Sequence, residues 1–241
     1  GGDNAPDANI KGAVNAINKV KAEVVLVGKE EVIRSKIKEF YGKEVEEISD
    51  RLKIKNATET IEMEDTPTLA IKHKKDSSMV VGFRMLKEDE GDVFISAGNS
   101  GALLTGATLI VGRIKGIDRP ALAGILPAYK SRLLLIDAGS NTNCKPINLL
   151  QFAQMSSIYL KNTYGIERPA IGLLNIGTEE TKGNDLVKLQ TIKRKIRRIR
   201  YQLCWKCRGK RCFFRQDRCN SNRWIYWKCI FKNNRRFRKI C

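Results

Sequence analysis

The chain has 241 residues, of which 42% are hydrophobic, and a formal net charge of +19. This length and apolar content suit one large α/β domain or two smaller ones with a real core, and they argue against overall disorder. No stretch approaches the roughly 18 uninterrupted apolar residues of a membrane span, and the first residues lack a signal-peptide pattern, so we expect a cytoplasmic protein. The start at Gly1-Gly2-Asp3, without an initiator Met, leads us to expect a clipped chain.

The apolar pattern predicts helices and strands that alternate through the first 190 residues. Helices are expected at 8–22, 29–42, 66–75, 77–89 and 148–165. Strands are expected at 22–28 and 45–49, and at the starts of 92–113, 131–141 and 169–180. Within 92–113 the predicted strand is followed by a glycine-rich turn and a helix of small residues. This alternation is typical of βαβ units with a mostly parallel sheet, in which ligands bind at the carboxyl ends of strands.

Three of the expected strand ends carry small or polar residues, at 96–101, 137–141 and 175–179. The first reads SAGNSG, and its glycines would bring backbone N–H groups close to an anion such as phosphate. An ordinary turn between strand and helix explains the same residues. Because the stretch matches neither GxxxxGKS nor GxGxxG, it does not imply a nucleotide.

Other polar features have a functional and a structural interpretation. The stretch 75–78, KDSS, offers donors at a helix start, but simple N-capping is favoured. The charged loop 175–184 suits either phosphate positioning or plain solvation. His73 is the only histidine, which disfavours a Ser-His-Asp triad and a metal site, and Cys144 is interpreted as structural.

Five stretches, taken together, resemble the bacterial phosphate acyltransferase family. They lie in the same order as in the family over residues 1 to about 188. They are GGDNAP (1–6), KKDSSMVVG (74–82), SAGNSGALLTGATLIVGRIKGIDRPALA (96–123), DAGSNTNCKPINLLQFAQM (137–155) and NIGTEETKGNDLVK (175–188).

The resemblance implies an activity and its setting. The family forms acyl phosphate from acyl-acyl-carrier protein and inorganic phosphate, which feeds glycerol-3-phosphate acylation in phospholipid synthesis. It implies a three-layer αβα fold related to phosphotransacetylase and isocitrate dehydrogenase, and a homodimer without metal or organic cofactor. Peripheral association with the membrane and a downstream membrane acyltransferase that uses glycerol 3-phosphate are also implied. The rival enzyme is a phosphate acetyl- or butyryltransferase that uses coenzyme A.

The resemblance also implies a site, because phosphate attack on a thioester needs a held dianion and donors for the oxyanion. The expected catalytic residues are Asn99, Asp137, Glu179 and Lys182. The expected phosphate- and substrate-binding residues are Asp3, Asn4, Ser96, Ala97, Gly98, Ser100, Gly101, Asn141, Asn175, Gly177, Gly183 and Asn184. The family also has a strand before GGDNAP that ends in Asp-Ala-Met, and its absence here puts the first loop in doubt.

The composition changes abruptly near residue 190. Residues 191–241 hold 19 of the 45 basic residues and one of the 26 acidic ones, so the first 190 residues carry 26 basic and 25 acidic residues. The same tail contains six of the seven cysteines and all three tryptophans, but no Ala, Val, Glu, Pro or Met. The predicted organisation is therefore an incomplete α/β domain at 1–190 and a basic Cys- and Trp-rich tail at 191–241.

The tail has two interpretations. Its cysteines and basic and aromatic residues are compatible with a zinc- or RNA-binding segment, although the cysteine spacing is irregular. The second interpretation comes from the genetic code. Trp-Lys-Cys occurs at 205–207 and again at 227–229. When its codons are read in a frame shifted by one base, they encode Gly, then Asn or Ser, then Val or Ala. The family carries Gly-Asn-Val at both places, so we infer an out-of-frame continuation after about residue 188. We expect neither a native fold for this tail nor activity of the 241-residue chain.

Overall fold

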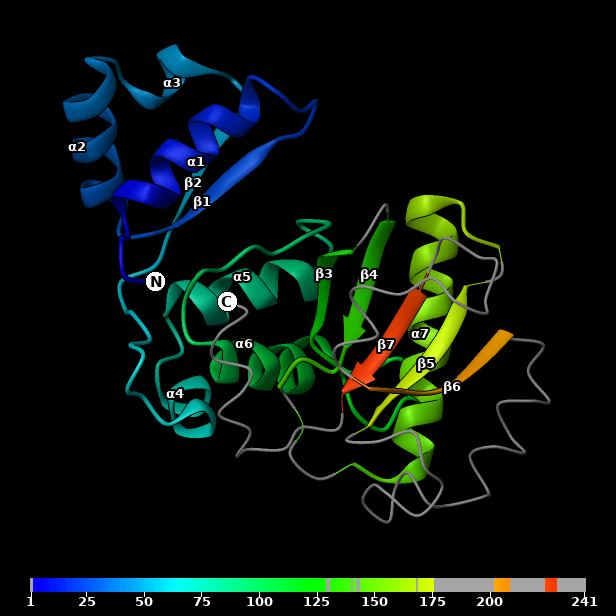
Figure 1. The fold of residues 1–241 in the computed structure, drawn as a ribbon. Helices are drawn as coiled ribbons and strands as arrows, with labels where there is room; N and C mark the ends of the chain where they lie inside the picture. Colours follow the sequence, from blue (N-terminus) through cyan, green and yellow to red (C-terminus); the bar gives the residue numbers. More distant parts are fainter. Residues whose placement is uncertain are drawn as a thin grey trace. The chain divides into compact units, whose positions relative to one another are not determined.

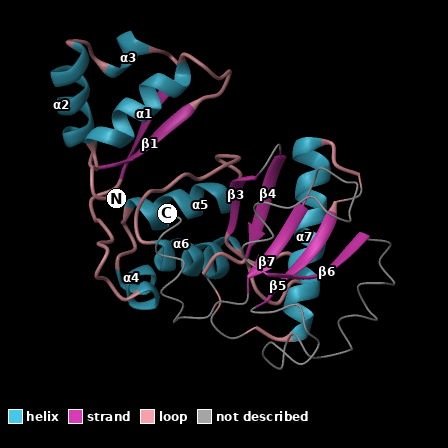
Figure 2. Cartoon of the chain, in the orientation of Figure 1, coloured by secondary structure: helices cyan, strands magenta, loops and turns pink. Residues whose placement is uncertain are grey.

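The computed structural model describes residues 2–128, 131–139, 141, 144–167, 169–175, 202–208 and 224–228. Its first unit contains α1 (Asp7–Ile17), β1 (Val24–Gly28), α2 (Glu30–Tyr41), α3 (Val45–Ile48), β2 (Leu52–Asn56), α4 (Pro67–His73), α5 (Ser78–Lys87), α6 (Ser100–Gly106) and the π-helix η1 (Ala107–Val111). Its second unit contains β3 (Ala123–Ala128), β4 (Ser131–Ile136), α7 (Pro146–Tyr164), β5 (Ala170–Asn175), β6 (Gln202–Arg208) and β7 (Trp224–Lys228). The units span residues 1–114 and 115–241, and Figure 2 shows helices and strands in both.

The first part of the first unit consists of two parallel strands, β1 and β2, that pack against helices. β1 and β2 pair in register from Val24 with Leu52 to Gly28 with Asn56. α1 buries its apolar face, which includes Ile10, and α2 buries Ile37, so that both helices share one core with the two strands. Burial of such a side chain contributes about 1.5–3 kcal/mol. The 3.6-residue periodicity read from the sequence therefore placed these helices correctly.

Two predicted strands of the first unit are absent. Residues 45–48 form the short helix α3, in which Val45 is buried in the α1–α2 core. Residues 92–97 pair with no strand among the described residues. Instead, the ring of Phe94 packs on Phe83 with centroids 5.1 Å apart, and it occupies the space beside Gly82. Tertiary packing thus determined the conformation of both segments, because a short apolar run does not by itself distinguish a strand from other buried structure.

The rest of the first unit is a cluster of helices. α4, α5 and α6 pack around a core that includes Ile71, Val80 and Phe83. α5 begins at a capping serine: the buried Ser77 hydroxyl accepts a hydrogen bond from the Val80 N–H at 3.4 Å and donates to the Lys74 carbonyl at 2.7 Å. The N-capping interpretation of residues 75–78 is therefore confirmed. His73, at the end of α4, is exposed.

The second unit is a five-stranded sheet with the order β3-β4-β7-β5-β6. β3 and β4 are antiparallel, and the three other pairings are parallel. α7 packs against the sheet (Figure 1) through a core that contains Ile136, Phe152 and Ile171. These observations confirm the predicted α/β class and mostly parallel sheet. β2 and β3 were not predicted, although the alternation of Leu52 and Ile54 with lysines is a strand signal.

Two stretches of the basic tail contribute backbone to this sheet. β6 pairs with β5, and β7 lies between β4 and β5, with Trp224 opposite both Leu133 and Ala170. From the sequence we expected no native fold in this tail. The Trp, Tyr, Ile and Leu content of these two stretches suits strands. The rest of 191–241 lies outside the described residues, and the division at residue 190 stays a prediction.

Among the described helices, none combines the length and the apolar character that a membrane crossing needs.

Candidate functional site

The glycine-rich stretch 96–101 forms a compact loop that leads into α6. The Ser96 hydroxyl accepts a hydrogen bond from the Gly98 N–H at 3.2 Å. The Asn99 side chain caps α6, because its carbonyl oxygen accepts from the Ala102 N–H at 3.0 Å. Gly101 lies against α4, where a Cβ would stand 2.8 Å from the Pro67 ring. The loop therefore needs a glycine at 101 for a packing reason.

Both polar atoms of the Asn99 side chain form hydrogen bonds that hold this loop in place. It is 7% exposed, and its amide nitrogen lies 3.2 Å from the carbonyl oxygens of Glu62, Met63 and Asp65. Its carbonyl oxygen is used by the cap of α6. We predicted Asn99 as a catalytic residue. In this structure its polar atoms hold the 62–65 segment against the loop and cap α6, and its catalytic role stays a prediction.

Ser100 is the exposed polar side chain of the loop. Its hydroxyl forms no hydrogen bond with the part of the chain that the structure describes. The N–H groups of Ser100 and Gly101 belong to the first turn of α6, where a helix offers no internal acceptor. One hydroxyl and two backbone amides therefore remain available to an anion at this loop.

The first residues of the chain lie against the same loop. Gly2 has φ +111°, and a Cβ built on it would stand 2.9 Å from the Ala97 carbonyl oxygen. The Asn4 carbonyl accepts from the Ala8 N–H at 2.9 Å at the start of α1, and the side chains of Asp3 and Asn4 are exposed. The structure thus brings the GGDNAP loop to the glycine-rich loop, as the prediction of a shared site requires.

Asp137 and Asn141 form a second group, at the end of β4. Asp137 is 1% exposed. One carboxylate oxygen accepts from the Leu122 N–H at 3.1 Å, and the other accepts from the backbone N–H and the side-chain amide of Asn141, at 2.8 and 2.9 Å. The Asn141 amide also donates to the Pro120 carbonyl at 2.9 Å. These contacts tie two loops of the second unit together at a strand end.

Cys144 lies close to this group. Partial burial raises the pKa of the Cys144 thiol, and the negative charge of Asp137 raises it further. A raised pKa keeps the thiol protonated, and the thiolate is the nucleophilic form. The side chain also packs against the core of the second unit. These observations support the structural interpretation of this residue.

The remaining predicted site residues are mostly outside the described part of the chain. Asn175 is the last residue of β5, at the carboxyl end of the strand, as expected. The residues that follow it in the predicted site lie outside the described residues, and their roles stay predictions. They are Gly177, Glu179, Lys182, Gly183 and Asn184.

Comparison with known proteins identifies the chain. The sequence model of a family described as "Fatty acid synthesis protein" matches residues 1–201. The phosphate acyltransferase of Acetivibrio thermocellus is 54% identical over 189 residues, which are 78% of this chain and 54% of that protein. That of Clostridioides difficile is 50% identical over 189 residues, with the same two coverages. EutD phosphotransacetylase from Staphylococcus aureus matches 91% of this chain and 82% of its own, with 10% identity and a TM-score of 0.45.

These matches define the class first: the chain belongs to the family described as "Fatty acid synthesis protein". More narrowly, it belongs to the phosphate acyltransferase family, which makes it an enzyme by family. The chain spans about half the length of the curated relatives it matches.

Proposed function

We propose that the intact protein transfers an acyl group from acyl-acyl-carrier protein to inorganic phosphate. A phosphate oxygen attacks the thioester carbonyl, the new C–O bond forms, and the C–S bond breaks to release the carrier thiol. Phosphate is itself a nucleophile at neutral pH, so the protein needs only to hold the dianion and stabilise the oxyanion. The products are acyl phosphate and free carrier protein.

This proposal rests on the glycine-rich loop at 96–101, in a chain that belongs to the phosphate acyltransferase family. Its Ser100 hydroxyl and the N–H groups of Ser100 and Gly101 have no hydrogen-bond partner among the described residues, while Asn99 and Gly2 fix its shape. We assign phosphate or acyl phosphate to these donors. Asp3 and Asn4 would border the same site. The substrate and catalytic roles predicted for Asp137, Asn141, Asn175, Glu179 and Lys182, which belong to the second unit, stay part of this proposal.

The test is phosphate-dependent release of the carrier thiol. The purified full-length protein should release carrier protein from acyl-acyl-carrier protein only when phosphate is present. Acyl phosphate should form in an equal amount. Faster turnover of acetyl- or butyryl-coenzyme A would instead assign the rival phosphate acetyl- or butyryltransferase activity. The absence of phosphate-dependent release with either donor would refute the proposal.

The cellular setting is part of the same proposal. The acyl phosphate would feed a membrane acyltransferase that acylates glycerol 3-phosphate in phospholipid synthesis. The protein would act as a cytoplasmic homodimer that associates peripherally with the membrane, without a metal or organic cofactor. Flotation with vesicles and the mass of the particle in solution test the membrane association and the dimer separately.

We also propose that residues 191–241 are an out-of-frame continuation. The family model ends its match at residue 201, close to the change in composition. The coding DNA across codons 185–241 decides this: a continuous shifted frame that encodes Gly-Asn-Val at both Trp-Lys-Cys positions would establish it. A coding sequence that supports the printed tail, together with zinc or salt-sensitive RNA binding by the protein, would favour the basic binding segment instead.

A further inference from the structure

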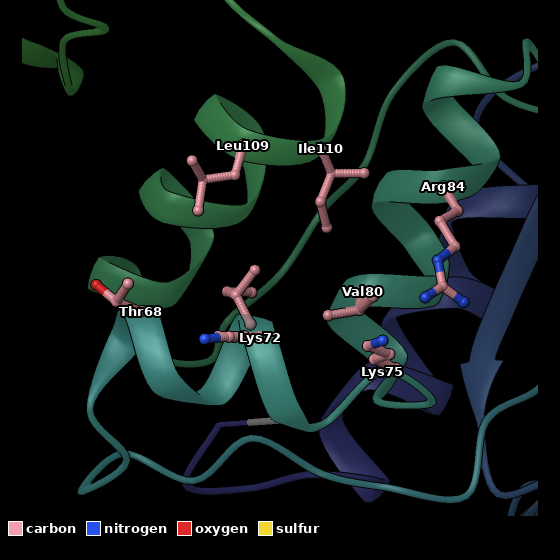
Figure 3. Close-up of a pocket in the computed structure, with 8 residues that line it drawn as sticks. Thr68, Lys72, Lys75, Val80, Arg84, Leu109 and Ile110 are labelled. Carbon is pink, nitrogen blue, oxygen red and sulfur yellow. The ribbon is translucent and has the colours of Figure 1, made fainter.

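Polar and charged side chains from several elements come near one another in both units, but they do not all converge. In the first unit, Lys72, Lys75 and Arg84 line a groove of about 340 Å³ between α4, α5 and η1. Figure 3 shows Lys72 pointing away from the other two, so these cations do not form one site. In the second unit, by contrast, both polar atoms of Gln151 on α7 bind the same loop.

Gln151 fixes the first half of this loop, which covers residues 116–122 and leads into β3. Its carboxamide oxygen accepts a hydrogen bond from the Asp118 N–H at 3.1 Å, and its carboxamide nitrogen donates to the Gly116 carbonyl at 2.8 Å. The side chain is 6% exposed, and a buried carboxamide is costly unless its polar atoms are bonded. The buried helix α7 therefore holds the loop from below through one side chain.

The second half of the loop is attached to two residues of the predicted site. The Asn141 amide donates to the Pro120 carbonyl at 2.9 Å, and the Asp137 carboxylate accepts from the Leu122 N–H at 3.1 Å. A displacement of the loop therefore moves the groups that hold the Asp137 carboxylate and the Asn141 amide in place.

Between its two attachments the loop carries an exposed cation, Arg119. This residue precedes Pro120, and the residue before a proline is restricted to extended backbone conformations. Burial and the charge of Asp137 raise the pKa of the Cys144 thiol, whereas the charge of Arg119 lowers it. The position of the loop thus also sets the electrostatic environment beside Asp137.

We propose that Gln151 is a positioning residue for the group formed by Asp137 and Asn141, and that it acts through the loop 116–122. This inference rests on the proposed function, in which Asp137 and Asn141 have predicted roles in acyl transfer. A misplacement of about 1 Å in an active site can cost about a hundredfold in rate. A buried side chain that fixes a loop can therefore control activity without touching the substrate.

The first test replaces Gln151 in the full-length protein. Gln151→Met nearly keeps the length of the side chain but removes both hydrogen bonds, so kcat/KM should fall about ten- to a hundredfold. The matched control is Gln154→Met on the same helix, because the Gln154 side chain forms no hydrogen bond with another residue that the structure describes. The control should change kcat/KM by less than about twofold. Full activity of Gln151→Met, or an equal loss in the control, would overturn the inference.

Gln151→Glu gives a readout that a loss of stability alone would not produce. Its carboxylate has no proton to donate to the Gly116 carbonyl, whereas the protonated form has an O–H donor and still accepts from the Asp118 N–H. Burial raises the pKa of such a carboxyl above the ordinary value of about 4.3. The deficit in kcat/KM should therefore shrink as the pH falls through that pKa, while the deficit of Gln151→Met stays constant. Parallel pH profiles of the two variants would contradict the inference, provided that urea unfolding shows both to be folded.

Hydrogen exchange separates this inference from the proposed function, because it needs no activity. In Gln151→Met the N–H groups of Leu122 and Asn141, which both bond to Asp137, should exchange at least about tenfold faster. The same two amides should stay within about twofold in Gln154→Met. Absence of phosphate-dependent thiol release by the unchanged protein refutes the proposed function. Unchanged exchange of both amides in Gln151→Met refutes the role of Gln151, even in an active enzyme.

Discussion

Gly2 contacts Ala97 across the junction of two loops that are far apart in sequence. The Ala97 carbonyl oxygen occupies the place that a side chain at residue 2 would need, 2.9 Å from an ideal Cβ, and Gly2 has the left-handed φ of +111°. Both properties favour glycine at this position. The contact joins the start of the chain to the loop that we propose for phosphate.

Gly2→Ala should therefore destabilise the first unit and displace the first loop. We expect a loss of about 2 kcal/mol in the free energy of unfolding, from backbone strain together with the clash. Urea unfolding measures this. The matched control is Gly12→Ala, in the exposed middle of α1 with no atom within 4 Å of the new methyl group. It should stabilise by about 0.5–1 kcal/mol. A neutral Gly2→Ala would show that the two loops do not meet in solution.

Asn99 should prove essential for the shape of the loop. Asn99→Ala is expected to cost about 2–3 kcal/mol, because it removes the cap of α6 and leaves three carbonyl groups without their donor. Asn99→Asp keeps the capping oxygen but places a carboxylate against those carbonyls, so it should destabilise by a similar amount. Thermal unfolding of the two variants measures the difference. Full stability of Asn99→Asp would contradict the network.

Ser100→Ala separates substrate binding from folding at the same loop. The side chain is exposed, so the free energy of unfolding should change by less than about 0.5 kcal/mol. If the hydroxyl donates to the phosphate dianion, kcat/KM for phosphate should fall about ten- to a hundredfold, which corresponds to one hydrogen bond to a charged group. Steady-state kinetics of the intact enzyme at varied phosphate gives this value. An unchanged kcat/KM would remove Ser100 from the proposed site.

Asp137 should stabilise the second unit through its carboxylate. Asp137→Asn replaces one acceptor oxygen with a donor that faces N–H groups, which should cost about 2–3 kcal/mol. Glu167→Gln makes the same chemical change in an exposed ion pair with Lys161, and we expect at most about 1 kcal/mol there. A double-mutant cycle between Asp137 and Asn141 should show coupling of about 0.5–3 kcal/mol. Additive effects would mean that the observed hydrogen bonds do not contribute.

The pair of Asp65 and Lys74 predicts a pH dependence. The hydrogen bond from Lys74 and one from the Glu62 N–H hold the pKa of Asp65 below its usual value. A lowered folded-state pKa stabilises the fold above the ordinary aspartate pKa of about 3.9, and this contribution is lost as pH falls through the lower value. The difference in stability between the unchanged protein and Asp65→Asn should therefore shrink in acid. Urea unfolding of both proteins at decreasing pH measures this difference, and a difference that stays constant into acid would contradict the prediction.

Some of the fold followed from local patterns. The apolar positions of α1, α2 and α7 repeat at helical spacing, and Ser77 carries a capping hydroxyl that acts through its own backbone neighbours. Such signals need no distant partner, so the sequence is sufficient to predict them. The change of composition near residue 190 and the motifs that indicate the family are likewise visible in the sequence alone.

Other features depended on contacts between distant segments. Val45 lies in a helix and Phe94 outside any strand because each side chain packs into a core that other elements form. Asn99 was predicted to be catalytic, and only the structure shows that its amide contacts a segment more than thirty residues away. The groove beside Arg84 also joins three elements that sequence alone does not bring together. Sequence determined the family, the local helices and the candidate loop, whereas tertiary packing decided which polar groups are already used and which remain free.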